Sequence, residues 1–482
     1  MAEKITKNTV FSNLFWKFSE KSVIEIVSFI VSIIIARLLD PSDIGIVALT
    51  TGLISIFSIF IDTGLGSALI QKLNPDDEDY STVFFANIIL CLIIYVLLFF
   101  CAPIIANYYN NVLLTKLIRI LGIKVIVLAI KNVQHAYISK NMLFKKFFYS
   151  SLSGTIIAGV VGIIMALNGF GVWSIVALDL IDCVVDTFVI WITIKWRPSF
   201  VFSLSKFKTL FSYGWKIFVS GLLDEVYNRL YQLVIGKKYS PADLAYYDKG
   251  DSIPRKIVKN INSSINNVMM PVLSNSQDDL LRMKNIGKRM LTINFYIVAP
   301  ILFGIMAISD NMIVLLLTEK WLPVLPYLKI MCIVYLIYPI DLCNLNIIKS
   351  LGRSDIFLKL EIIKKIIGLI ILIVSSNYGI FAMVCGVLIS SIIGCLINAY
   401  PNKRLINYGL IKQIKDLLPI ILLNLFMYLG VYFISFINVN LYIKMLIQIL
   451  CGVALYIIPS YVLKIDSFEY CFGILKNYKD KK

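Results

Sequence analysis

One segment of the sequence, residues 243–272, carries a long series of polar side chains within a predicted helix. They recur at three- and four-residue spacings, which places them on one helix face. The members are Asp248, Asp251, Ser252, Arg255, Lys259, Asn262, Ser263 and Asn266. Lysine binds phosphate as a point charge, and arginine binds it as a planar fork. This face therefore predicts contact with an anionic group such as a phosphate or pyrophosphate.

Two other predicted helices carry similar polar faces. Residues 209–236 contain a stripe with Asp224, Glu225, Asn228, Arg229 and Gln232, and residues 12–36 contain Lys17, Lys21 and Glu25 one turn apart. Charges at membrane depth are costly unless they face protein or a wet cavity. We therefore predict a water-filled substrate cavity between two halves of the chain. Its predicted lining is Lys17, Lys21, Arg229, Asp251, Arg255, Lys259 and Asn262.

Three carboxylates on these faces are candidates for ion coupling: Glu25, Glu225 and Asp224. A carboxylate near the midplane can take up H⁺ or Na⁺ in one state and release it in another. The competing interpretation is that basic neighbours one turn away, Lys21 and Arg229, neutralise them. Asp251 and Arg255 also have the spacing of an intrahelical pair.

A further set of charges lies on two predicted helices, 113–138 and 171–194. The first places Lys124 and Lys131 on one face, and the second places Asp179, Asp182 and Asp186 on one face. Mutual pairing and ligand contact both remain open for this set. The single histidine, His135, favours a structural or interfacial role over proton coupling.

Several kinds of chemistry lack their motifs. No G-x-x-x-x-G-K-[ST] or H-E-x-x-H sequence occurs, and no two of the nine cysteines have CxxC spacing. The sequence therefore predicts no catalytic residue, no metal and no cofactor. Short loops on one side of the predicted membrane also argue against an enzyme.

The composition determines the fold class. The chain has 482 residues, of which 59% are hydrophobic and 16% are charged, whereas soluble domains have about 45–50% apolar and about 25% charged residues. It is predicted to be an all-α integral membrane protein with about 14 transmembrane helices. Their expected ranges are 12–36, 44–69, 82–107, 113–138, 147–167, 171–194, 209–236, 243–272, 288–309, 323–348, 356–375, 379–399, 416–437 and 441–463.

Lysine and arginine are unevenly divided between alternate loops. One set of loops contains 26 of them and the other set contains five. The positive-inside rule then places both termini in the cytoplasm. This asymmetry explains most of the net charge of +17 without nucleic acid as a partner. No signal peptide is predicted at the N-terminus.

The sequence contains an internal repeat. At an offset of 200 residues, 37–45 superposes on 237–245, and at an offset of 208, 171–176 superposes on 379–384. We therefore expect two parallel six-helix repeats, related by an axis along the membrane normal. The predicted division is an N-terminal lobe at 1–205, a C-terminal lobe at 206–405, and two further helices with a cytoplasmic tail at 406–482.

Several motifs resemble a known family. They lie at 36–45, 62–71, 169–173, 196–198, 235–237, 270–279 and 352–355. They are similar to those of Wzx-type polysaccharide flippases in the multidrug/oligosaccharidyl-lipid/polysaccharide exporter superfamily, in the branch of colanic-acid and teichuronic-acid exporters. One departure is Ala245, where such proteins commonly have glycine.

The resemblance implies a substrate and a location. It implies that an undecaprenyl-pyrophosphate-linked oligosaccharide repeat unit crosses the bacterial inner membrane by alternating access, for O-antigen or exopolysaccharide synthesis. H⁺ or Na⁺ would be the coupling ion, and membrane lipids the surroundings. The alternatives are another substrate, such as a peptidoglycan lipid precursor or a small drug, and a membrane polysaccharide polymerase or ligase.

The loop charges generate a topology prediction. Lys206 lies in a lysine-rich loop and Asn440 in a loop without basic residues, so we expect them on opposite sides of the membrane. Single cysteines at these positions, labelled with an impermeant maleimide in intact cells, report the side of each. Labelling of both from the same side would contradict the helix count.

Overall fold

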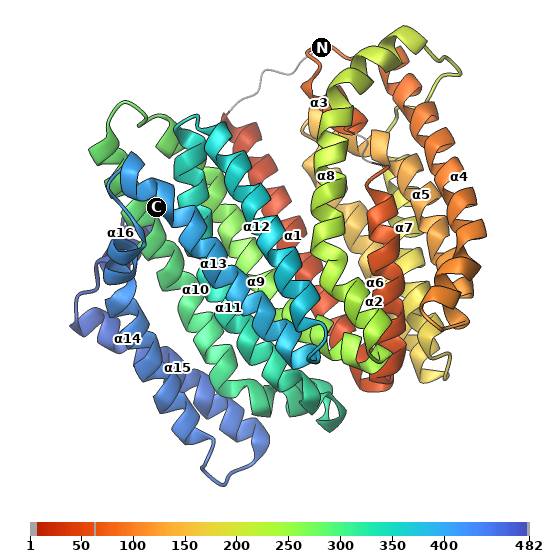
Figure 1. The fold of residues 1–482 in the computed structure, drawn as a ribbon. Helices are drawn as coiled ribbons and strands as arrows, with labels where there is room; N and C mark the ends of the chain where they lie inside the picture. Colours follow the sequence, from red (N-terminus) through yellow and green to blue (C-terminus); the bar gives the residue numbers. More distant parts are fainter. Residues whose placement is uncertain (1–6, 62–63, 480–482) are drawn as a thin grey trace. The chain divides into compact units, whose positions relative to one another are not determined.

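The structure of the chain is a computed structural model that describes residues 7–61 and 64–479 (Figure 1). Over these residues the chain is helical and has no β-strand. It divides into two compact units, 1–245 and 246–482, with the division near the start of the helix α9 (Pro241–Ser274). This division places the helix α8 (Leu204–Lys238) in the first unit. The lobe boundary at 205/206 describes the sequence repeat and remains a prediction.

The first unit contains eight helices. They are α1 (Lys7–Leu38), α2 (Pro41–Ser58), α3 (Leu65–Gln71), α4 (Asp77–Tyr108), α5 (Leu113–Lys140), α6 (Phe144–Leu167), α7 (Val172–Thr193) and α8 (Leu204–Lys238). Helices α4 and α5 form one hairpin, and α6 and α7 form another. Helix α1 packs on α6, whereas α8 packs on α2 and α3.

The second unit is built around α10. Its elements are α9 (Pro241–Ser274), α10 (Leu280–Leu317), the 3₁₀ helix η1 (Glu319–Val324), α11 (Leu325–Ser350), α12 (Ser354–Ser375), α13 (Ile380–Leu405), α14 (Leu410–Ile434), α15 (Leu441–Val462) and α16 (Asp466–Lys479). Helix α10 contacts α11, α14, α15 and α16.

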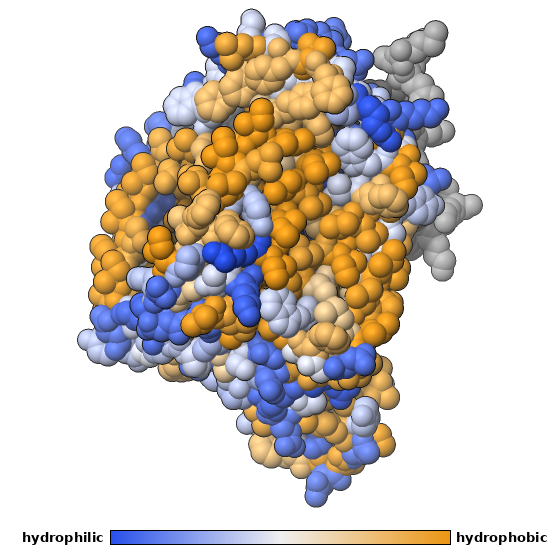
Figure 2. Space-filling view, turned by 90° about the vertical axis from the view of Figure 1, so that its right-hand side faces the viewer, coloured by the Kyte–Doolittle hydropathy of each residue, from blue (hydrophilic) through white to orange (hydrophobic). Residues whose placement is uncertain are grey.

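The prediction of an all-α membrane protein with about fourteen helices is confirmed. Fourteen of the described helices have 18 or more residues, and eight are long and apolar enough to cross a membrane by themselves. The other six are α1, α5, α7, α8, α9 and α12, and all of them except α12 carry charges identified above. Large hydrophobic side chains are exposed along α4, and hydrophobic residues cover much of the face in Figure 2.

The structure differs from the predicted helices in two places. The predicted helix at 44–69 is interrupted, because α2 ends at Ser58 and α3 begins at Leu65. Gly64 has a φ of +72°, and a Cβ there would lie 2.3 Å from the carbonyl oxygen of Gly214. Only glycine fits this close approach of two backbones. The second difference is α16, which lies in the segment predicted only as a tail.

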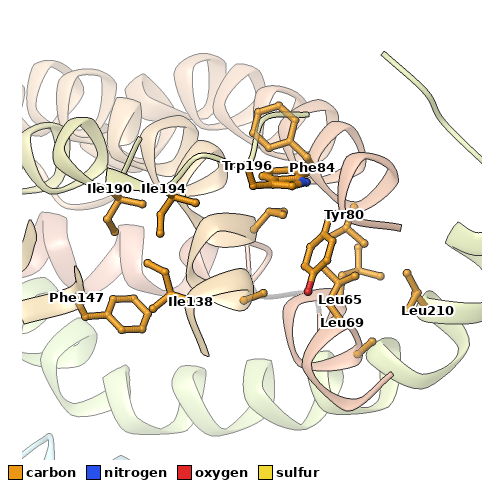
Figure 3. Close-up of a cluster of buried hydrophobic side chains, with 14 residues drawn as sticks. Leu65, Leu69, Tyr80, Phe84, Ile138, Phe147, Ile190, Ile194, Trp196 and Leu210 are labelled. Atoms are coloured by element: carbon orange, nitrogen blue, oxygen red, sulfur yellow. The ribbon is translucent and has the colours of Figure 1, made fainter. Parts of the chain in front are cut away.

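A buried cluster in the first unit surrounds Trp196, which follows α7 (Figure 3). Its ring lies 5.6 Å from that of Tyr80 and 6.4 Å from that of Phe84, measured between centroids. The indole nitrogen donates to Asp77 over 3.2 Å, and Gln134 donates to the Trp196 carbonyl over 3.2 Å. The motif at 196–198 therefore has a packing role, because it joins the ends of α4, α5 and α7.

The start of α2 approaches Pro241 so closely that no side chain fits between them. A Cβ on Gly45 would lie 1.7 Å from the Pro241 carbonyl oxygen. Since backbone atoms cannot yield like a flexible side chain, Gly45→Ala is expected to cost about 1–3 kcal/mol. The measurement is the melting temperature of the purified protein in detergent.

Gly304→Ala is the matched control, because a Cβ there meets nothing within 4 Å and α10 gains a better helix former. Its melting temperature is expected to equal or exceed that of the wild type. Equal melting temperatures for Gly45→Ala and the wild type would disprove the close approach.

Candidate functional site

The polar face of α8 is organised by an ion pair. The Arg229 Nε lies 2.7 Å from a carboxylate oxygen of Glu225, one turn away, and Arg229 also donates to Gln232 over 3.3 Å. Gln232 in turn donates to the carbonyl of Ala48 on α2 over 3.0 Å. The predicted neutralisation of Glu225 by Arg229 is therefore confirmed, and the same chain of contacts ties α8 to α2.

The polar face of α9 begins with a second paired group. Arg255 contacts Asp251 at 3.2 Å, which confirms the intrahelical pair, and the hydroxyl of Tyr335 on α11 donates to Asp251 over 2.8 Å. The Asp251 side chain is 14% exposed and that of Arg255 is 32% exposed. The carboxylate thus anchors the guanidinium while part of the guanidinium stays accessible to a ligand.

Further along α9, the face is occupied by amides that join helices. Asn262 is buried, donates to the carbonyl of Val258 over 2.9 Å, and accepts from Asn294 on α10. Asn346 on α11 donates to Asn266 over 2.6 Å. This stripe therefore has two parts, with charged groups near its start and helix–helix hydrogen bonds near its end. A substrate contact of Asn262 stays a prediction.

The remaining predicted positions are accessible to different degrees. Lys21, Asp224 and Lys259 are exposed, and Glu25 is half-buried. The side chain of Lys17 lies outside the described residues, although its backbone belongs to α1. Substrate binding by Lys21 and Lys259, and ion coupling by Glu25, Glu225 and Asp224, stay predictions.

The charges of α5 and α7 pair with each other. Lys124 lies 2.5 Å from Asp179, and Lys131 lies 2.7 Å from Asp186. Asp182 accepts a hydrogen bond of 3.0 Å from Thr155 on α6. Of the two possibilities that the sequence left open, pairing is the one that the structure shows.

His135 belongs to the packing of the same region. It is half-buried, and its ring meets that of Phe147 edge to face at 4.6 Å between centroids. This contact supports a structural role.

The sequence did not reveal a buried amide network in the second unit. Asn344 on α11 and Gln413 on α14 exchange hydrogen bonds of 2.9 and 2.8 Å, and Asn402 on α13 donates to Asn344 over 2.7 Å. Its only sequence signal was a pair of amide side chains in each of three apolar helices. Since an unpaired amide in a bilayer is costly, such residues call for partners, but the sequence does not name them.

A second missed cluster joins the loop before α4 to the start of α8. Lys206 contacts Asp76 and Glu78, each at 2.6 Å, and Lys72 contacts Asp79 at 2.6 Å. The hydrogen bond from Lys206 lowers the pKa of the Asp76 carboxyl to about 2. Asp76 therefore stays charged well below neutral pH while it caps α4.

No group of three or more histidine, cysteine, aspartate or glutamate side chains is placed to hold a metal ion in the described part of the chain. The polar faces of α8 and α9 contain two ion pairs, Arg229–Glu225 and Arg255–Asp251, and the exposed Lys259. The cations among them can attract an anion.

Comparison with known proteins identifies the family. The family described as polysaccharide biosynthesis protein matches residues 34–326, which is more than half of the chain. The chain belongs to this family. The match includes the charged faces of α8 and α9.

Two curated relatives extend the comparison. The chain is 28% identical over 309 residues to the teichuronic acid biosynthesis protein TuaB of Bacillus subtilis, which covers 62% of each chain. It is 23% identical over 336 residues to the succinoglycan biosynthesis transport protein ExoT of Rhizobium meliloti, which covers 69% of this chain and 67% of that one. The chain thus spans about two thirds or less of the length of these relatives.

Solved structures share the fold. The lipid II flippase MurJ in an inward closed conformation superposes with a TM-score of 0.76 at 17% identity, covering 92% of this chain and 99% of that one. An inward-facing multidrug resistance transporter of the MATE family gives a TM-score of 0.61 at 14% identity, covering 80% and 95%. The helical architecture of the family member described here is therefore that of these transporters.

The α5–α7 pairs generate a stability prediction. The side chains of Lys131 and Asp186 are 12% and 9% exposed, so Lys131→Met leaves a carboxylate buried without its cation. We expect a loss of about 3–5 kcal/mol, measured as unfolding free energy in mixed micelles.

The double variant Lys131→Met/Asp186→Leu provides the control. Replacing both charges with apolar groups is expected to restore stability to near the wild-type value. If the double variant is as unstable as the single one, the pair is not the cause of the loss.

Proposed function

We propose that this chain is a flippase for a lipid-linked oligosaccharide in surface polysaccharide synthesis. Membership in the polysaccharide biosynthesis family is the observation that carries the proposal. One relative is named as a succinoglycan biosynthesis transport protein and another as a teichuronic acid biosynthesis protein. The proposed substrate is an undecaprenyl-pyrophosphate-linked repeat unit, moved by alternating access without chemical change.

The charges on α9 fit the headgroup of such a substrate. A pyrophosphate link is anionic, and arginine binds it through paired hydrogen bonds. Arg255 is held in place by Asp251 yet remains 32% exposed, and Lys259 on the same face is exposed. We assign these two cations to the pyrophosphate.

The proposed location is the bacterial inner membrane with both termini in the cytoplasm. The excess of lysine and arginine in one set of loops supports this orientation. Transport would then run from the cytoplasmic to the outer leaflet. Because the chain carries no P-loop motif, we attribute the direction of transport to H⁺ or Na⁺ coupling or to consumption of the product outside.

The transport proposal makes a specific prediction. Arg255→Ala and Lys259→Ala are each expected to reduce translocation by at least about tenfold, since each removes a charged contact to the headgroup. The measurement uses proteoliposomes loaded with a fluorescent polyprenyl-pyrophosphate oligosaccharide, whose outward movement exposes it to a membrane-impermeant quencher.

Lys359→Ala is the matched control, because Lys359 is an exposed lysine that belongs to α12 and not to α8 or α9. It should leave translocation unchanged. Translocation of a small drug or of a peptidoglycan precursor in preference to the oligosaccharide would favour the alternative exporters. Formation of a new glycosidic bond would favour a polymerase or ligase.

The same proteoliposomes test ion coupling by Glu25 and Glu225. With an imposed pH or sodium gradient, Glu25→Gln or Glu225→Gln is expected to abolish the stimulation by the gradient. Asp224→Asn is compared in parallel. If every variant keeps full stimulation, these carboxylates do not couple transport to an ion.

A further inference from the structure

The second unit contains a large groove that plays no part in the contacts described so far. It has a volume of about 1890 Å³ and lies among α10, α14, the end of α15 and the start of α16. Its apolar lining includes Leu418, Leu422, Phe426, Ile458 and Val462, each of which is at least 47% exposed. A groove that is open and apolar along its length takes hydrocarbon rather than water.

The dimensions of the groove match one leaflet of a bilayer. Along α10 the lining runs from Leu281 to Ile293, and along α14 it runs from Lys415 to Phe426. These distances correspond to helical rises of about 18 Å and about 16 Å. Since the hydrocarbon core is about 30 Å thick, half of it is about 15 Å. Acyl chains of a single leaflet therefore fit along the groove.

One end of the groove is basic. Arg282, Arg289, Lys415 and Lys464 line it, and no carboxylate of the described residues lies within 4.0 Å of their charged nitrogens. Arg289 lies over the ring of Tyr470, 4.8 Å from its centroid, which leaves its hydrogen-bond donors for another partner. These four residues lie in segments that belong to the lysine-rich set of loops, which the positive-inside rule places in the cytoplasm.

Two of the carboxylates at the same end already have hydrogen-bond or ion-pair partners within the protein. Asp416 contacts Lys288 at 2.7 Å and accepts from Tyr408 over 3.0 Å. Asp279 accepts from the backbone N–H of Arg282 over 2.9 Å and caps α10. Asp466 and Glu469 lie in the first turn of α16, where the helix dipole favours negative charge. The lining thus has a small excess of positive charge, with five basic side chains against four carboxylates.

The packing and the aromatic residues of helix α16 indicate that the basic end of the groove lies at a membrane interface. It packs on α10 and α15, and Figure 1 shows it near the C-terminus beside these helices. Its Phe468 lies 6.2 Å from Tyr461 of α15 and 5.7 Å from Phe472, measured between ring centroids. Aromatic rings next to lysine and aspartate are typical of a helix that lies along the headgroup region.

We infer that this groove binds an anionic phospholipid of the surrounding leaflet, with its phosphate on Arg282, Arg289 and Lys415 and its acyl chains along α14 and α15. Basic pockets between helices at a membrane face bind anionic headgroups in this way. The lining has the length of one leaflet, which matches the acyl chains of a phospholipid better than a much longer polyprenyl chain. The inference does not depend on what the chain transports.

The test is native mass spectrometry of the purified full-length chain. The protein is incubated with equal amounts of phosphatidylglycerol and phosphatidylethanolamine that carry the same acyl chains. The wild type is expected to retain phosphatidylglycerol preferentially. The triple variant Arg282→Gln/Arg289→Gln/Lys415→Gln is expected to lose this preference, by about fivefold for each cation removed.

Two control variants isolate the groove. Lys145→Gln/Lys195→Gln/Lys208→Gln removes three exposed lysines of the first unit and should keep the preference. Leu422→Trp keeps every charge but fills the apolar part, and should remove one bound phospholipid. This second variant keeps the test valid if the triple Gln variant does not fold.

The result that overturns the inference is unchanged lipid retention in both the triple Gln variant and Leu422→Trp. Absence of a preference in the wild type, or its equal loss in the lysine control, also overturns it. A polyprenyl phosphate that displaces phosphatidylglycerol from the wild type but not from Leu422→Trp would assign the groove to the carrier lipid, and the resident-lipid inference would be wrong.

Discussion

The hydrocarbon of a bilayer does not solvate a charged group, and the rest of this structure depends on that constraint. A charged or amide side chain in hydrocarbon must find a partner in the protein or face water. In the first unit Lys131 pairs with Asp186. In the second unit Asp251 pairs with Arg255 and accepts a hydrogen bond from Tyr335. The ion pairs named here lie on α5, α7 and α9, which are not among the eight helices apolar enough to cross a membrane by themselves. Polar contacts therefore decide which helices are neighbours.

Two uses of polarity are combined on α9. Near the start of the helix, Asp251 holds a guanidinium that keeps part of its surface accessible. Near the end, Asn262 and Asn266 form hydrogen bonds to α10 and α11. The amide hydrogen bonds support the function of the ion pair, because a cation recognises a headgroup only if its helix is held at a constant position. Packing and recognition on one helix thus support each other.

The sequence predicted most of the fold because membrane helices obey simple rules of length and charge. Uncharged runs bounded by basic loops marked some helix ends closely, as at 441–463 against Leu441–Val462, whereas α10 extends eight residues beyond each end of the predicted 288–309. The interruption before Leu65 was missed, because it depends on contact with Gly214, far along the chain. The partners of the buried charges were also beyond the sequence. Lys124 and Asp179 are 55 residues apart, and spacing within a helix cannot show that they meet.

The two ion pairs between α5 and α7 have a mechanical consequence. Lys124 and Lys131 are seven residues apart, as are Asp179 and Asp186, so the pairs are two helical turns apart, about 10.5 Å. Sliding one helix past the other by a single turn would break both pairs at once. The two helices are therefore locked in register and move as one rigid piece.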